Sequence, residues 1–123
     1  MSKNERFYLS THEWVEFTVE GTALIGISDY AQLQLGDIVF VNLPDVGESI
    51  SIGARFADVE SVKGVSDVLS PVSGTITKIN EELLDSPQLI NEYAEGTWLI
   101  EVSEISARGE LLSSSAYAAI STC

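Results

Sequence analysis

One segment of the chain predicts a β-hairpin with a lysine at its tip: Val59-Glu60-Ser61-Val62-Lys63-Gly64-Val65-Ser66-Asp67. Two runs that favour strands, 56–62 and 65–69, flank the dipeptide Lys63-Gly64. Glycine at the second central position admits the positive φ that many tight turns need. The Lys63 amine is therefore expected at an exposed turn, either as a solvated residue, the commoner role of an isolated lysine, or as a chemical handle.

Further strand-forming patterns surround this hairpin. Alternating polar and apolar residues or β-branched runs, separated by Gly, Pro and Asp turns, predict strands at 7–9, 13–19, 22–27, 38–43, 48–52, 75–79 and 97–102. Glu20-Gly21 is expected to join two of them in a hairpin, and Ser73-Gly74 to form another turn. Many short strands indicate a mostly β fold, a small sandwich or barrel, and 123 residues fit one domain.

Short helices are predicted at the periphery of this β fold. Ser28 can accept a hydrogen bond from the first turn of a helix that Gly36 ends. Asn80 is expected to cap a helical turn over 81–84 in the same way. Apolar residues at roughly helical spacing predict a C-terminal helix over 109–119.

The charge of the chain excludes several classes of function. Six Lys and Arg against nineteen Asp and Glu give a net charge of −13, which repels nucleic-acid phosphates and anionic membranes. No segment approaches the about 20 apolar residues of a membrane-spanning helix, and residues 1–6 do not resemble a targeting segment. We therefore expect a cytoplasmic protein that binds neither nucleic acid nor membrane, and whose charge suits partners with basic patches.

No enzyme signature appears in the sequence. His12-Glu13 is the one local pairing of a histidine with a carboxylate, and strand spacing would direct the two side chains to opposite faces. Cys123 alone cannot form an intramolecular disulfide, and no CxxC pair offers metal ligands. Trp14 and Trp98 lie on predicted strands, where aromatic residues mostly fill the core. The residues alone thus indicate an acidic β domain with a lysine at a turn, and no metal site.

Three blocks of sequence resemble the glycine cleavage system H proteins. The match continues in order and spacing through Ile79-Asn80-Glu81 to Glu110-Leu111-Leu112, so it covers nearly the whole chain. The three blocks are Ser10-Thr11-His12-Glu13-Trp14-Val15, the run from Gly26 to Pro44 (GISDYAQLQLGDIVFVNLP), and the run from Val59 to Gly74 (VESVKGVSDVLSPVSG).

The resemblance implies the barrel-sandwich hybrid fold of lipoyl and biotinyl carriers, as a single lipoyl-carrier domain over residues 1–123, with lipoate covalently attached to Lys63. In that family the lipoyl group is loaded by glycine decarboxylase (P protein). It is unloaded by the tetrahydrofolate-dependent aminomethyltransferase (T protein) and reoxidised by dihydrolipoamide dehydrogenase (L protein). The chain would then be a monomeric, non-catalytic carrier in glycine catabolism and one-carbon metabolism, and lipoate-attaching enzymes would be further partners.

The same resemblance assigns roles to residues around Lys63. The family shelters the loaded aminomethyl arm in a surface cleft, and Thr11, Glu13 and Asp67 match its lining; carboxylates there would pair with the amine of the arm. Glu60 and Gly64 flank the lysine where a lipoylating enzyme should recognise the hairpin. The chain departs from the family pattern at Gly64, where Ala is more frequent, in the shortened segment 91–98 and in the serine run 113–115.

Three alternatives remain compatible with parts of this pattern. An H-like relay would pass lipoyl groups to other carrier domains without taking part in glycine cleavage. A biotin carrier would share the fold, although such carriers resemble Met-Lys-Met at the tip and this chain has Val62-Lys63-Gly64. An enzyme would need a substrate pocket around His12 and Glu13.

Overall fold

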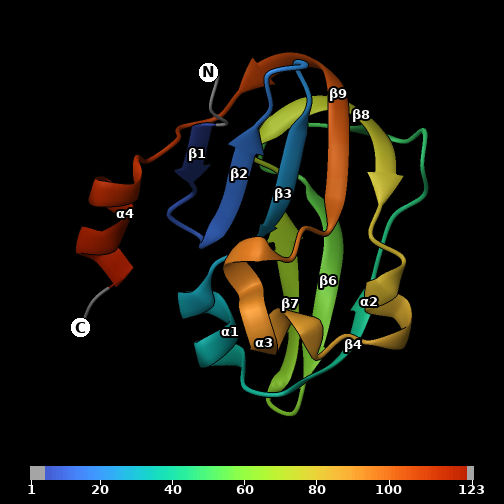
Figure 1. The fold of residues 1–123 in the computed structure, drawn as a ribbon, viewed down its shortest axis with the longest axis vertical. Helices are drawn as coiled ribbons and strands as arrows, with labels where there is room; N and C mark the ends of the chain where they lie inside the picture. Colours follow the sequence, from blue (N-terminus) through green and yellow to red (C-terminus); the bar gives the residue numbers. More distant parts are fainter. Residues whose placement is uncertain (1–4, 122–123) are drawn as a thin grey trace.

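Two antiparallel sheets form the framework of the fold, with the hydrophobic core between them (Figure 1). The computed structural model describes residues 5–121, so Cys123 lies outside the described residues. One sheet has six strands in the order β1-β2-β3-β9-β8-β5, and the other has three in the order β4-β6-β7. The strands are β1 Glu5–Tyr8, β2 Glu13–Phe17, β3 Ala23–Ile27, β4 Ile38–Asn42, β5 Ser49–Ile50, β6 Arg55–Ser61, β7 Gly64–Leu69, β8 Val72–Ile79 and β9 Ile100–Arg108.

The predicted mostly β character and the presence of short helices are confirmed, although the C-terminal helix predicted over 109–119 begins only at Ser114. Within residues 5–121 the strands form two sheets without a closed barrel. The helices are α1 Asp29–Leu35, α2 Glu82–Asp85, α3 Leu89–Tyr93 and α4 Ser114–Ser121, with a 3₁₀ turn at Ala94–Gly96. None of them is long and apolar enough to cross a bilayer.

Helix α1 begins and ends as its sequence predicts. The Ser28 hydroxyl accepts a hydrogen bond from Ala31 N at 3.2 Å, and Gly36 ends the helix with a φ of +79°. Such a φ suits glycine because it has no Cβ to clash with the backbone. Figure 1 shows α1 and α3 together beside the lower part of the β6–β7 hairpin.

The predicted turn at Ser73-Gly74 is wrong, because both residues lie inside β8 next to a shift in its pairing register with β9. A Cβ on Gly74 would lie 2.6 Å from Val102 Cγ1 and 2.7 Å from Ser103 O. Glycine is therefore required here for the close approach of two strands, which sequence alone does not distinguish from a turn.

The segment around Trp98 also differs from its prediction. Asn80 does not cap a helix, because its side-chain amide donates to Trp98 O at 2.8 Å, and α2 begins at Glu82 without a side-chain cap. The strand predicted at 97–102 begins only at Ile100 and extends to Arg108. Trp98 is half-buried outside any strand, whereas Trp14 is 1% exposed and fills the core as predicted.

Strand β2 separates the main core from a smaller aromatic cluster. Val15 and Phe17 belong to the main core, while Trp14 packs on the other side with Tyr8 and Tyr117. The rings of Tyr8 and Tyr117 stack with their centroids 4.3 Å apart, which holds α4 against β1. Glu13 occupies the same face of β2 as Val15 and Phe17, since alternate residues of a strand share a face. A carboxylate is thereby placed at the end of the main core.

Candidate functional site

Lys63 lies in the turn between β6 and β7, at the bottom of Figure 1. Ser61 pairs with Gly64 across the hairpin, so the central residues are Val62 and Lys63, one position earlier than the sequence predicts. The Ser61 hydroxyl accepts a hydrogen bond from Lys63 N at 3.1 Å. Gly64 begins β7 with a φ of +138°, a value that L side chains disfavour. The turn residues and Gly64 are all exposed.

The turn rests against the C-terminal end of α1. Lys63 Nζ donates to Gln34 O at 3.1 Å, and Val62 N donates to Asp37 O at 3.1 Å. A Cβ at Gly36 would lie 3.7 Å from Lys63 Cε and 3.5 Å from Val62 Cγ2. The aliphatic part of Lys63 therefore passes close to the glycine that ends the helix.

Asn91 of α3 holds this end of α1 in place. Its side-chain amide donates to Gly36 O and to Gln32 Oε1, both at 2.9 Å, and its oxygen accepts from Ile38 N at 2.8 Å. The three hydrogen bonds join α3, α1 and the start of β4. Because Asn91 is only partly exposed, these bonds have less competition from water than the bonds of a fully exposed side chain.

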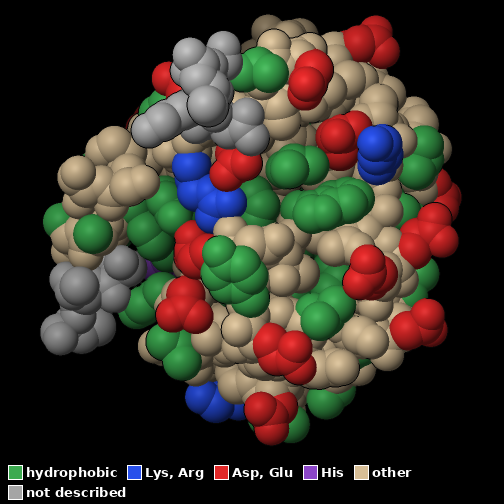
Figure 2. Space-filling view, in the orientation of Figure 1, with side chains coloured by type: hydrophobic (Ala, Val, Ile, Leu, Met, Phe, Trp, Pro, Cys, Tyr) green, Lys and Arg blue, Asp and Glu red, His purple; other side chains and the backbone are tan. Residues whose placement is uncertain are grey.

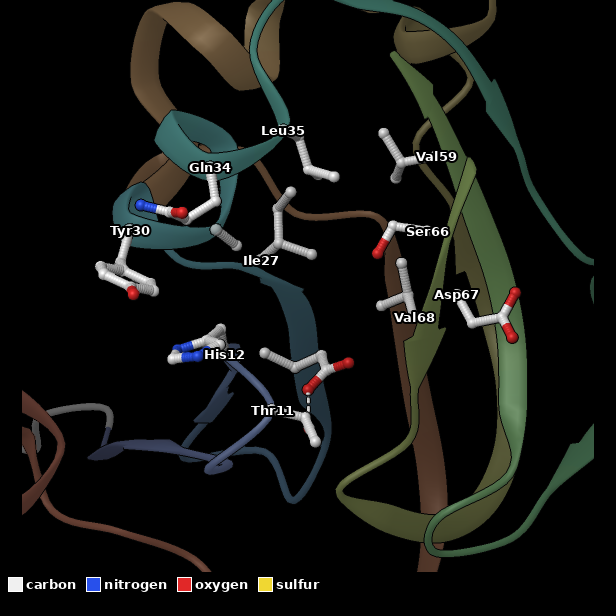
Figure 3. A pocket seen from close by; sticks show the side chains of 12 residues that line it. Thr11, His12, Ile27, Tyr30, Gln34, Leu35, Val59, Ser66, Asp67 and Val68 are labelled. Carbon is white, nitrogen blue, oxygen red and sulfur yellow. Dashed lines mark hydrogen bonds between the residues drawn. The ribbon is translucent and has the colours of Figure 1, made fainter. Parts of the chain in front are cut away.

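A cavity of about 140 Å³ lies between α1, the start of β2 and the sheet that carries the hairpin (Figure 3). Gln34, whose carbonyl oxygen contacts Lys63, is one of its lining residues. Its remaining walls combine apolar side chains with a few polar groups: Thr11, His12, Glu13, Ile27, Tyr30, Ala31, Leu35, Val59, Ser66, Asp67 and Val68.

Glu13 is the buried carboxylate of this cavity, with 3% of its surface exposed. Burial raises its pKa, and the hydrogen bonds from the Thr11 hydroxyl and from Leu69 N partly oppose that rise. The second bond is 2.8 Å long and reaches Oε2, so each carboxylate oxygen has a donor. The two hydrogen bonds hold the carboxyl group at a fixed position, and its charged form would gain from a cation beside it.

His12 lines the same cavity, contrary to the predicted opposite orientation of His12 and Glu13. The reason is that His12 precedes the strand and has a φ of +81°, so strand alternation does not apply to it. Its Nδ1 lies 2.8 Å from the Tyr117 hydroxyl, which lies 2.6 Å from Ser28 Oγ. Burial lowers the pKa of His12 and favours the neutral ring.

Comparison with known proteins assigns the family. A family model described as glycine cleavage H-protein matches residues 6–122. The chain belongs to the glycine cleavage H-protein family. The resemblance read from the three sequence blocks is thereby confirmed.

Individual relatives agree with this assignment over most of their length. A glycine cleavage system H protein of Lachnoclostridium phytofermentans is 52% identical over 110 residues, which are 89% of this chain and 87% of that protein. One of Herpetosiphon aurantiacus is 50% identical over 117 residues, covering 93% and 88%. The crystal structure of a glycine cleavage system H protein from Mycobacterium marinum has a TM-score of 0.88 at 40% identity, covering 96% of this chain and 97% of that one.

The site residues suggested by the resemblance to this family fall into two groups. Thr11 and Glu13 are joined by a hydrogen bond at the cavity wall. Asp67 also borders the cavity, but in Figure 3 its carboxylate points away from it, because Ser66 and Val68 are the residues of β7 that face inward. On the outer face, Asp67 lies opposite Asp58 and 3.9 Å from Arg55 Nε.

Glu60 lies on that same outer face of the three-stranded sheet. It pairs with Val65 on one side and Phe40 on the other, and its carboxylate accepts a hydrogen bond from the Asn42 amide at 3.1 Å. Val65 is 65% exposed and Phe40 43% exposed, so an acidic side chain lies between two exposed apolar ones near the Lys63 turn.

Sequence reasoning did not find several residues that shape the site. Gln34, Tyr30, Asn91 and Tyr117 come from three helices that only the tertiary fold brings together. Tyr30 and Gln34 lie in the block 26–44 that carries the family resemblance, and Asn91 begins the segment 91–98 that departs from the family pattern, but neither signal indicated a role at this site. Acidic side chains are spread over the face seen in Figure 2, with few basic ones among them.

Proposed function

We propose that this chain is the lipoyl carrier of a glycine cleavage system, with lipoate joined by an amide bond to Lys63 Nζ. The observation that carries the proposal is a family match over residues 6–122 combined with an exposed lysine in a β-hairpin turn. The carrier would be one domain over residues 1–123, non-catalytic, monomeric and cytoplasmic. When attached, the lipoyl group supplies the sulfur chemistry that carries the aminomethyl group of glycine.

The residues around Lys63 fit such a group. The amine is exposed, and a Cβ at Gly64 would have nothing within 4 Å, so the turn leaves room for an acylating enzyme. Gln34 contacts Lys63 and also lines the cavity, so a group attached to Lys63 would begin close to the cavity wall. The amide removes the lysine charge and tethers the group at high local concentration near a docked active site.

The cavity residues would hold the amine of the loaded arm. Glu13 would place its negative charge beside that amine, while the Thr11 hydroxyl and Leu69 N fix the carboxylate. The apolar walls of Ile27 and Val68 would exclude water from the chain of the arm. We also keep Asp67 as a proposed contact, through its main chain at the cavity edge, since its carboxylate points outward.

Proposed partners are glycine decarboxylase, the aminomethyltransferase, dihydrolipoamide dehydrogenase and the lipoate-attaching enzymes. We assign Glu60 and Gly64 to recognition by the last of these. Glu60→Gln is expected to slow acylation of Lys63 several-fold, because it removes a negative charge beside the turn without changing the size of the side chain. Glu110→Gln, at an exposed position outside the hairpin, is the matched control. Equal acylation rates for both variants and the wild-type chain would remove Glu60 from the proposed interface.

Mass spectrometry of the chain from lipoate-competent cells tests the central proposal. We expect one lipoyl addition, mapped to the peptide that contains Lys63, and no addition in Lys63→Arg. Lys78 is an exposed lysine of β8 and serves as the internal control. An addition on Lys78, a biotinyl addition or an unmodified Lys63 contradicts the proposal. Glycine-dependent aminomethyl transfer with the three partner enzymes then separates the cleavage carrier from a lipoate relay.

A further inference from the structure

The Lys63 side chain is docked on the chain before any acyl group is attached. Its Nζ donates to Gln34 O, and its Cε lies 3.7 Å from the position of a Cβ at Gly36. The neighbouring Val62 N donates to Asp37 O. The turn thus forms two hydrogen bonds with residues at and just after the end of α1, and the aliphatic part of Lys63 passes close to Gly36.

Acylation changes what this nitrogen can donate. The ammonium group has three N–H donors, whereas the amide that lipoate would form keeps one. That single N–H needs one acceptor, which is either water or a protein group. Gln34 O is already 3.1 Å from Nζ. As one of the last carbonyl groups of α1, it has no partner inside the helix and is free to accept.

We propose that the C-terminal turn of α1 is a cradle for the acyl-lysine amide, with Gln34 O accepting its N–H and Asn91 positioning the cradle. This inference rests on the proposed acylation of Lys63. Because Gln34 also lines the cavity, an amide held there starts the acyl chain at the cavity wall instead of in bulk water. The arm then has a preferred direction, which lowers the entropy cost of its entry into the cavity.

Asn91 is the positioning residue because it acts on the cradle without lining the cavity. Its amide donates to Gly36 O and Gln32 Oε1, and its oxygen accepts from Ile38 N, so it fixes α1 on one side of Gln34 and the following loop on the other. Removing these bonds leaves the hairpin intact, since the β6–β7 pairing does not involve Asn91. The position of Gln34 O relative to Lys63 would then become variable.

Solvent exchange of the acyl-lysine N–H tests the cradle directly. The chain is labelled with ¹⁵N at lysine Nζ and octanoylated by a lipoate-attaching enzyme, and mass spectrometry confirms one addition on Lys63. The amide gives one ¹⁵N–H resonance, while the ammonium groups of the other lysines give none in the amide region. We expect its exchange to be slower by a factor of about 2 to 10 than in an octanoylated 59–67 peptide, the range of one net hydrogen bond.

Variants of Asn91 test whether slow exchange of the acyl-lysine N–H depends on the cradle or on folding of the chain in general. Asn91→Ala should bring the exchange rate close to that of the peptide, and Asn91→Asp should do the same because it cannot donate to Gly36 O. Gln88→Ala is the matched control, since Gln88 is exposed at the start of α3 and its side chain makes no capping bond. Dispersed backbone resonances establish that each variant is folded.

The outcomes distinguish this inference from the function on which it rests. Failure of Lys63 to accept the acyl group overturns both. An acylated Lys63 whose N–H exchanges at the peptide rate in the wild-type chain overturns the cradle and leaves the carrier function standing. If the N–H is protected in the wild-type chain and equally protected in folded Asn91→Ala and Asn91→Asp, the cradle stands and the positioning role of Asn91 is overturned.

Discussion

Glu13 is a buried carboxyl group at the wall of the cavity. It is a buried acid whose two oxygens each accept one hydrogen bond, and burial still raises its pKa above the ordinary value of 4.5. A carboxylate in such a position costs stability when it is ionised and no cation is present. In the proposed function, the amine of the arm would offset that cost.

Glu13→Gln should reveal this cost through its pH dependence. Since the folded state raises the pKa of Glu13, its favourable contribution is present below pH 4.5 and is lost as the pH rises through the raised folded value. Glutamine does not titrate there, so the free energy of unfolding of the wild-type chain minus that of the variant should fall as the pH rises. Urea unfolding from pH 4 to pH 8 measures this difference.

The exposed Glu81→Gln serves as the control, for which no comparable trend is expected. A difference between the wild-type chain and Glu13→Gln that is constant or increases with pH would contradict the account of Glu13.

Gly74→Ala tests the close approach of β8 and β9. The added Cβ would lie 2.6 Å from Val102 Cγ1 and 2.7 Å from Ser103 O, and a backbone oxygen cannot move aside without disturbing the ladder. We expect a loss of about 1–3 kcal/mol in the free energy of unfolding, as for other overpacked sites. Gly21→Ala is a useful comparison, because a Cβ there meets nothing within 4 Å, and its cost should come from its φ of +88° alone. Equal losses at both positions would contradict the steric argument.

At the level of single residues, the structure tests the predicted positions of side chains. Lys63, Glu13 and Thr11 were selected from motifs, and the structure places all three at or beside one cavity. Asp67 came from the same motif, yet strand alternation turns its carboxylate outward. His12 and Gly74 were misplaced because a positive φ and a close strand contact depend on neighbours far along the chain.

At the level of elements, α4 is held against the sheet mainly through Tyr117. Tyr117 stacks on Tyr8, and its hydroxyl contacts Ser28 Oγ and His12 Nδ1. It therefore links the C-terminal helix to the cap of α1 and to a wall residue of the cavity. Few other contacts of α4 reach the body of the molecule, since its remaining described side chains, from Ser114 to Ile120, are exposed.

Tyr117→Phe should loosen α4 more than it destabilises the sheets. The change keeps the ring on Tyr8 and leaves Ser28 and His12 without their shared partner, a loss of about 1–3 kcal/mol for partly buried groups. Hydrogen exchange should show faster exchange of the α4 amides than in the wild-type chain and unchanged protection in β2 and β3. Ser115→Ala, at an exposed position of the same helix, is the control. Unchanged exchange in α4 would show that ring stacking alone holds the helix.

Strands and helix ends were predictable to different degrees. Helix α1 agrees with its prediction because Ser28 and Gly36 act through local geometry. The Lys63 hairpin was predicted with its turn one residue late, since the residue pattern does not fix the register. Asn80 was expected to act locally but bonds to Trp98 instead, and α3 carries no strong periodic pattern in five residues.

For the molecule as a whole, we expect the net charge of −13 to affect the rate of association with partner proteins more than the free energy of unfolding. If the proposed partners present basic surfaces, the association rate constant with a lipoate-attaching enzyme should fall several-fold between low and physiological ionic strength. The dissociation rate constant should change less, because short-range contacts determine it. Stopped-flow measurements at several salt concentrations provide both values, and an association rate constant independent of salt would contradict electrostatic steering.

The two-sheet architecture follows from patterns that the sequence shows, whereas the order of strands does not. Alternation and turn residues indicate a mostly β fold, but no local signal places β9 between β3 and β8. The same holds for the cavity, whose walls come from β2, α1 and the β6–β7 hairpin. Such contacts join residues far apart in sequence.

The central position of β9 has a consequence for synthesis of the protein. While the ribosome is still translating the segment before Ile100, β3 and β8 each have an edge without its final partner. The β6–β7 hairpin, in contrast, joins consecutive strands and needs no later part of the chain for its own pairing. The nascent chain can thus pair its lysine-bearing hairpin before residues 100–108 are translated, whereas its large sheet needs them.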